Sequence, residues 1–179
     1  QISHAFLYSG GVMTDLGTLG GDVSTATDIN DAGQIVGSAT LVGQSSPHAY
    51  WYDNGVMLDL GTLGGDASYA YGLNEAGDVV GFSYTAGNAD ISGFLYSGGQ
   101  LYDLNDLIDP ASGWVIDYAY DINNFGNIIA HGCNSTLSLC GAVLLNSVSA
   151  TSTDIPEPTV LALFGFGLSG LSLCRRRCR

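Results

Sequence analysis

The sequence predicts an all-β fold: a β-propeller-like array of about three four-stranded blades, followed by one C-terminal hydrophobic helix. Three observations predict this class. A segment of about 44 residues recurs along the chain. Each copy consists of short apolar runs separated by turns rich in glycine and asparagine. A single uncharged apolar stretch then lies close to the C-terminus.

The repeat is visible directly in the sequence. Residues 4–37 and 48–81 align at a fixed offset of 44, and 21 of these 34 positions are identical. A third copy starts near residue 92 and takes five extra residues before it resumes at Ala119, and a partial fourth copy starts at residue 141. Self-similarity at a fixed period is typical of repeat architectures. We therefore predict one β-repeat domain over residues 1–146.

Each copy contains four apolar runs, which in the first copy cover residues 5–8, 13–19, 26–29 and 34–37. Runs of this length that are rich in β-branched and aromatic residues, with Gly and Asn between them, are typical of strands joined by hairpins. Four strands in about 44 residues match the size of one propeller blade. No segment of the repeats shows the sustained 3.6-residue period of a helix.

The blades are predicted by grouping runs two, three and four of one copy with run one of the next. This grouping gives three blades over residues 12–52, 56–96 and 100–145. It leaves residues 5–8 as the outer strand of a blade whose other strands the sequence does not contain. Since propellers usually have about four to eight blades, we expect an incomplete array: part of a longer repeat protein, or an open stack.

The repeat resembles a known family. The pattern is His-Ala-Phe, then Asp-Leu-Gly-Thr-Leu-Gly-Gly, which recurs verbatim at residues 15–21 and 59–65, then Ile-Asn-x-x-Gly. Over roughly residues 4–145 it resembles the HAF-type extracellular repeat of bacterial secreted proteins. The resemblance implies export and a β-propeller-like fold, and it implies no assigned chemistry. The third copy departs from the pattern, with Asp-Leu-Asn-Asp-Leu at residues 103–107.

Charge is distributed very unevenly. The chain has no Lys, and its four Arg lie within residues 175–179, so residues 1–174 have a net charge of −17 with His neutral. Phosphate binding needs Lys or Arg, so this body excludes a nucleic-acid partner. The 46% apolar content and ten tyrosines argue against a disordered chain.

The C-terminal segment has the parts of a sorting signal. A Ser/Thr-rich linker over residues 147–153 precedes Pro156, Glu157 and Pro158, and residues 159–174 carry no charge. As a helix these sixteen residues would span about 24 Å, somewhat less than the roughly 30 Å hydrocarbon core of a membrane. A cluster of arginines follows and would hold that end on the cytoplasmic side. The cluster consists of Arg175, Arg176 and Arg177.

Residues 154–179 resemble the PEP-CTERM sorting signal. The resemblance implies an exported protein that is anchored in the inner membrane by its C-terminal helix and then cut near residues 156–158. The cutting enzyme would be an exosortase, a membrane transpeptidase. These systems accompany exopolysaccharide production, which suggests a biofilm or matrix setting by association. The alternative is an ordinary single-pass anchor.

Four cysteines form two pairs in the sequence. Cys133 and Cys140 flank a polar stretch, which fits a disulfide across a hairpin in an oxidising compartment; two free thiols are the alternative. Cys174 and Cys178 bracket the arginine cluster and could be lipidated or be small apolar fillers.

No cofactor is predicted from the remaining polar residues. His4 and His48 occupy equivalent positions, and we expect them to make structural hydrogen bonds at strand starts. Residues 28–33 offer the dense Asp and Asn oxygens that calcium prefers. Their counterparts vary between copies, which favours Asx-turn hydrogen bonding over a calcium site.

Tyr69, Tyr71, Tyr118 and Tyr120 lie at equivalent third-run positions of the second and third copies. They could stack on sugar rings or pack between sheets, and packing is the favoured interpretation. The sequence therefore predicts a non-enzymatic structural or interaction protein of the cell surface. The alternative is a carbohydrate-binding module that uses exposed tyrosines with Trp51 and Trp114. An extracellular hydrolase has the least support, since no pair of carboxylates is singled out.

Overall fold

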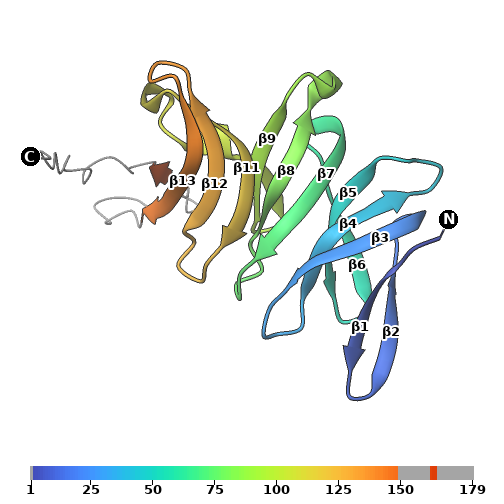
Figure 1. The fold of residues 1–179 in the computed structure, drawn as a ribbon. Coiled ribbons are helices and arrows are strands. Elements are labelled where there is room, and N and C mark those ends of the chain that lie inside the picture. The colour runs from blue at the N-terminus through green and yellow to red at the C-terminus, as the bar shows by residue number, and fades with distance from the viewer. Residues whose placement is uncertain (1, 149–161, 165–179) are drawn as a thin grey trace, which may run out of the picture.

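The computed structural model describes residues 2–148 and 162–164, which form one hairpin and three four-stranded sheets (Figure 1). All paired strands within these sheets are antiparallel. The hairpin consists of β1 (Ala5–Ser9) and β2 (Val12–Gly17). The all-β class predicted from the sequence is confirmed.

Each sheet contains four strands that are consecutive in the sequence. The first sheet consists of β3 (Gly20–Ile29), β4 (Ile35–Leu41), β5 (Pro47–Asp53) and β6 (Val56–Gly61). The second consists of β7 (Gly64–Leu73), β8 (Val79–Thr85), β9 (Ile91–Ser97) and β10 (Gln100–Asp103). The third consists of β11 (Trp114–Ile122), β12 (Ile128–Asn134), β13 (Leu139–Val148) and β14 (Ala162–Phe164). Three short helical turns complete the fold: η1 (Ala86–Asn88), α1 (Leu104–Leu107) and η2 (Pro110–Ser112).

The predicted grouping of the runs is wrong by one run. Each complete sheet holds runs three and four of one copy followed by runs one and two of the next, as in β3 to β6. The chain changes sheets at Gly17–Gly20 and at Gly61–Gly64, where the glycines at both ends have positive φ. Inside the first of these crossovers, the Thr18 hydroxyl donates to Gly21 O at 2.8 Å and accepts from Gly20 N at 3.1 Å. The Gly-Thr-Leu-Gly motif is therefore a sheet-to-sheet crossover and not part of a hairpin.

The turns between runs one and two are two-residue hairpin turns, as the glycine pattern predicts. Asn54 and Gly55, which join β5 to β6, have φ values of 49° and 85°. Gly98 and Gly99, which join β9 to β10, have φ values of 59° and 85°. Positive φ at both central positions is the signature of a type I′ turn, whose twist matches that of the flanking strands.

The sheets pack face to face in sequence order, and a separate apolar cluster fills each gap. Buried side chains between the hairpin and the first sheet include Leu16 and Tyr50. Val36 and Phe94 lie in the cluster that joins the first and second sheets. The cluster between the second and third sheets is the largest and includes Leu104, which is fully buried. The described residues form an open stack, and no closed barrel or propeller is detected among them.

The predicted C-terminal helix falls mostly outside the described residues. For the described part, Ala162–Phe164, the prediction of a helix is wrong. These residues form β14, which pairs with the end of β13 over Asn146–Val148. The unpaired edge of β13 offers backbone hydrogen bonds that a short apolar segment can take as a strand. Within residues 2–148 and 162–164, no helix is long and apolar enough to cross a membrane.

Candidate functional site

Several predicted site residues lie outside the described part of the chain. They are the sorting-signal residues Pro156, Glu157, Pro158, Arg175, Arg176 and Arg177, and the second cysteine pair, Cys174 and Cys178. The linker over residues 147–153 is described only as far as Val148.

The first cysteine pair is joined in the structure. Cys133 and Cys140 are bonded to each other, and they are directly opposite partners in the register of β12 and β13. The hairpin that they close is also held by Asn134, whose side chain donates to Ser112 O at 2.9 Å and accepts from Leu137 N at 3.0 Å. The pair therefore fixes the outer end of the third sheet.

All three histidines bind an aspartate through Nδ1. The Nδ1 of His4 lies 2.9 Å from Asp15, that of His48 lies 3.0 Å from Asp59, and that of His131 lies 2.8 Å from Asp117. The predicted structural hydrogen bonds of the first two histidines are thus confirmed. Since His4 and a backbone N–H both bond to its carboxylate, the pKa of Asp15 is lowered.

The third copy has no histidine at the equivalent position. There the Ser92 hydroxyl donates to the Asp103 carboxylate instead, and the Asn105 N–H donates to the same carboxylate at 2.8 Å. The aspartate recurs in all three copies, while the side chain bonded to it changes from His to Ser. We interpret the bond as structural, because in each copy it joins the two outer strands of a sheet.

The dense Asp and Asn segments are closed by asparagine side chains. Asn74 Oδ1 accepts from Ala76 N at 3.0 Å and Asn123 Oδ1 accepts from Phe125 N at 2.9 Å, which makes both segments Asx turns. The same two oxygens, and that of Asn30, also accept from the N–H four residues further on. The predicted Asx-turn hydrogen bonding is therefore observed in the second and third copies. Over residues 2–148 and 162–164, no group of three or more His, Cys, Asp or Glu is placed to hold a metal ion.

The same asparagines connect neighbouring sheets. Asn30 Nδ2 donates to Asn74 O at 3.1 Å, and Asn74 Nδ2 donates to Asn123 O at 3.4 Å. One residue further on, Glu75 accepts from Asp31 N at 3.0 Å. We call these contacts the asparagine ladder; it runs across the turns that follow β3, β7 and β11.

Aromatic side chains form a continuous row across the second and third sheets. The aromatic row consists of Tyr69, Tyr71, Phe82, Tyr84, Tyr118 and Tyr120. Tyr69 stacks on its cross-strand partner Phe82, with ring centroids 4.8 Å apart and planes inclined by 12°. Phe82 also meets Tyr118 of the third sheet at 5.0 Å. Packing between sheets, the favoured interpretation of the four tyrosines, is therefore observed.

The row is packed but not buried. Tyr120 is 47% exposed, and Tyr71, which stacks on it at 6.0 Å, is half-buried. Desolvation raises the pKa of Tyr71, and the neighbouring tyrosines add to this shift. Phe82 and Tyr84 were not predicted from the sequence, although their alternation on β8, opposite Tyr69, is a signal that marks them.

The two tryptophans do not belong to this row. Trp51 is half-buried against the cluster between the first and second sheets, and Trp114 is half-buried against the cluster between the second and third. The structure does not bring them together with the tyrosines, as the alternative carbohydrate-binding interpretation would need, because both rings pack on the apolar clusters between the sheets.

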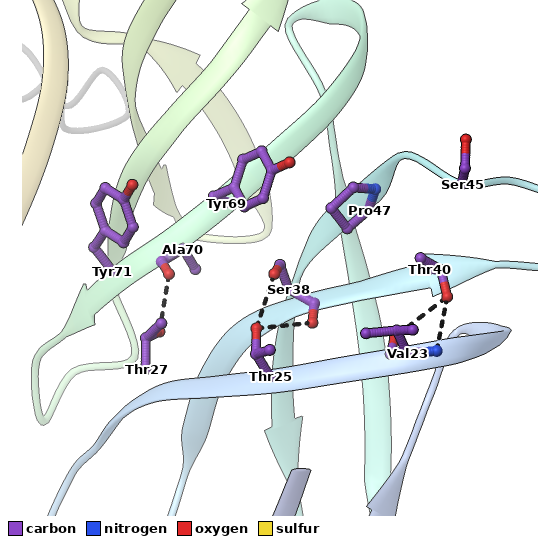
Figure 2. Close-up of a pocket in the computed structure, with 10 residues that line it drawn as sticks. All are labelled: Val23, Thr25, Thr27, Ser38, Thr40, Ser45, Pro47, Tyr69, Ala70 and Tyr71. Atoms are coloured by element: carbon purple, nitrogen blue, oxygen red, sulfur yellow. Dashed lines mark hydrogen bonds between the residues drawn. The ribbon is translucent and has the colours of Figure 1, made fainter. Parts of the chain in front are cut away.

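An open groove of about 410 Å³ lies between the first sheet and β7 (Figure 2). Hydroxyl side chains of the first sheet face Tyr69, Ala70 and Tyr71 across it. The lining from the first sheet and the loop before β5 consists of Val23, Thr25, Thr27, Ser38, Thr40, Ser45 and Pro47. Thr27 spans the groove, since its hydroxyl donates to Ala70 O at 2.8 Å.

The groove exists because the first copy has small residues where the later copies have rings. Thr25 and Ser38 are cross-strand partners, with hydroxyls 3.1 Å apart, at the positions that Tyr69 and Phe82 occupy in the second sheet. In the third sheet His131 occupies the position of Ser38. Aromatic rings therefore fill the gap between the second and third sheets, and the gap before them stays partly open.

Comparison with known proteins identifies the C-terminal segment. Residues 154–177 match the PEP-CTERM protein-sorting motif, which confirms the predicted signal. The match supports an exported protein that is processed by an exosortase, a membrane enzyme. No curated protein and no solved structure matches this chain. The HAF-type resemblance of the repeats accordingly stays a prediction.

Proposed function

We propose that this chain is a non-enzymatic structural or interaction protein of the cell surface or extracellular matrix. Its β-repeat body would be delivered there by way of the C-terminal signal. The observation that carries the proposal is the match of residues 154–177 to the PEP-CTERM motif, behind a body built from repeated, cross-bonded sheets. A body without Lys or Arg also fits a surface that repels anionic lipid head groups.

The proposed body is an incomplete β-propeller-like array of the HAF type. Support comes from the face-to-face order of three four-stranded sheets, each built from the end of one repeat and the start of the next. A closed ring would leave the innermost strands β3, β7 and β11 around its axis.

Exosortase processing is tested with the full chain, behind a supplied export signal, in cells with and without the enzyme. We expect cleavage near Pro156–Pro158, detected by intact mass, only when exosortase is present. Replacing Pro156 and Pro158 with Ala should abolish the cleavage, while the linker variant Ser152→Ala should be cleaved like the wild type. Retention of residues 159–174 in the presence of active exosortase would show that the segment is a permanent anchor.

A second function, carbohydrate binding, is favoured by the aromatic row and its exposure. Tyrosine rings can stack on the apolar faces of sugars while their hydroxyl groups remain exposed to solvent. A glycan array probed with the full chain tests this function. Binding that is lost in Tyr71→Ala and Tyr120→Ala variants would support recognition over a purely structural role. Turnover of any polysaccharide by the purified protein would overturn the non-enzymatic proposal.

A further inference from the structure

We propose that the groove between the first sheet and β7 binds a segment of an uncharged polysaccharide. The inference rests on the carbohydrate-binding function proposed above and adds the place of binding and the charge class of the ligand. Three properties of the groove carry it: a wall of fixed tyrosine rings, hydroxyl groups with free bonding capacity, and the absence of Lys and Arg from residues 1–148.

The ring wall is held in place before any ligand arrives. Tyr69 is stacked on Phe82 at 4.8 Å, and Tyr71 is stacked on Tyr120 at 6.0 Å. Side chains fixed by such contacts lose little rotamer freedom on binding, which preserves affinity. A sugar ring that enters the groove would therefore meet aromatic groups that are already oriented.

The hydroxyl groups divide into two sets. Those of Thr27 and Thr40 are committed to the backbone, to Ala70 O at 2.8 Å and to Val23 O at 3.2 Å. The Thr25 hydroxyl lies 3.1 Å from Ser38 Oγ and donates to Ser38 O at 3.5 Å, so both protons of this pair are engaged and its free lone pairs can accept from a ligand. The hydroxyls of Tyr69 and Tyr71 make no hydrogen bond to another described residue, as is also true of Ser45. Free groups that both donate and accept match the hydroxyl groups of a sugar.

Charge selects the kind of polysaccharide. No cationic side chain lines the groove, and residues 1–148 carry carboxylates but no Lys or Arg. A uronic-acid or sulfated polymer would be repelled by this body, whereas a neutral glucan or mannan would not. The volume of about 410 Å³ falls within the range of roughly 300–1,000 Å³ that is usual for ligand pockets. The groove is open, so a polymer need not end inside it.

Substitutions that test the groove can be taken from the equivalent positions of the second sheet. Thr25→Tyr with Ser38→Phe installs the pair that the second sheet already carries as Tyr69 and Phe82. This change fills the groove without removing any of its tyrosines. Thr14→Tyr adds a ring of the same size on the exposed face of β2 and is the matched control. Tyr71→Ala removes part of the ring wall, so it tests the site by taking away a contact and not by filling the space.

The experiment is affinity electrophoresis of the full chain in gels that contain dextran, laminarin or mannan, with alginate and hyaluronan as acidic polymers. We expect retardation in at least one neutral gel and none in the acidic gels. The filled variant and Tyr71→Ala should each weaken binding by roughly tenfold or more, which corresponds to about 1.4 kcal/mol. The Thr14→Tyr control should bind like the wild type. Melting curves establish that each variant is folded.

The possible failures are distinguishable. If the wild type is retarded in no gel, the carbohydrate-binding function itself fails. If the filled variant binds like the wild type, binding occurs elsewhere and the groove is excluded, even where Tyr71→Ala weakens binding, because Tyr71 also belongs to the aromatic row. Stronger retardation in alginate than in every neutral gel would overturn the charge class. Should the filled variant not fold, Thr25→Tyr alone, at an exposed side chain that lines the groove, decides the location.

Discussion

The gap between the first and second sheets and the gap between the second and third are built on the same backbone and filled differently. In the first, the paired hydroxyls of Thr25 and Ser38 leave a groove. In the second, the stacked rings of Tyr69 and Phe82 fill the space against Tyr118. A repeat fold can therefore keep its sheet spacing while single cross-strand pairs decide where a groove forms.

The two gaps also differ in how they are bridged. In the first, Ser68 Oγ accepts from Ala49 N at 2.8 Å and donates to Gly61 O at 2.6 Å. In the second, the side-chain amide of Asn105 forms the bridge through both its oxygen and its nitrogen. It accepts from Ile116 N at 2.7 Å and donates to Ile116 O at 2.9 Å.

The largest effect is expected from removing these bridges. Asn105→Ala leaves both backbone groups of the buried Ile116 unpaired and also removes the bond from Nδ2 to Ser92 Oγ, so it should lower the free energy of unfolding by about 3 kcal/mol. Ser68→Ala removes two bonds and should cost about 2 kcal/mol. Urea denaturation measures both. Gln44→Ala, at an exposed amide, is the control and should stay within roughly 0.5 kcal/mol of the wild type. Equal losses at Asn105 and Ser68 would remove the distinction between the two gaps.

A smaller effect is expected from opening the second gap. Phe82→Ser with Tyr84→Thr gives β8 the residue types that β4 carries at Ser38 and Thr40. Losing two half-buried rings and the contact with Tyr118 should cost about 2 kcal/mol. Thermal melting measures the loss, and a structure of the variant should show a second groove. A collapsed gap would mean that side chains, and not the backbone, set the sheet spacing.

A gain in stability is expected one gap earlier, in the apolar cluster between the hairpin and the first sheet. Tyr50 and Phe94 are equivalent and fully buried, but the Tyr50 hydroxyl has no hydrogen-bond partner among the described residues. Its burial raises the pKa of Tyr50 to about 12. Tyr50→Phe removes the unpaired hydroxyl and should raise the free energy of unfolding by about 1 kcal/mol in urea denaturation. A loss of stability would indicate a bound water at the hydroxyl.

The smallest effect is expected at the hairpin and appears only as a pH dependence. Because His4 lowers the pKa of Asp15 in the folded state, ionised Asp15 favours folding. That contribution is present above the unfolded pKa of about 3.9 and is lost as the pH falls through the lower folded value. Asp15→Asn should flatten this part of the stability curve, measured by urea midpoints between pH 2 and 5. His4→Gln should reproduce most of the change; parallel curves for all three proteins would contradict it.

Local chemistry was enough to predict the strands and their turns. The Asn54–Gly55 and Gly98–Gly99 turns follow from residues that adopt positive φ readily, and the apolar runs follow the period of a strand. The grouping of strands into sheets could not be predicted in the same way. All four runs of a copy look alike locally, and only the crossover at Gly17–Gly20 separates one sheet from the next.

The sequence predicts only part of the candidate site. The tyrosines at 69, 71, 118 and 120 could be identified because they are aromatic and occupy equivalent positions of two copies. The groove depends instead on what is missing at Thr25 and Ser38, and small polar residues carry no signal unless they are compared with their repeat equivalents. Whether Trp51 is exposed likewise depends on the neighbouring sheet, which the sequence alone does not place.

The asparagine ladder has a consequence for how such a protein can change its length. Each donor points from one copy to the next, from Asn30 to Asn74 and from Asn74 to Asn123, so every internal copy both gives and receives one bond. An in-frame duplication of 44 residues would insert a copy with both capacities intact. Duplication or deletion of one repeat can therefore lengthen or shorten the stack without leaving an unpaired polar group at the new junction.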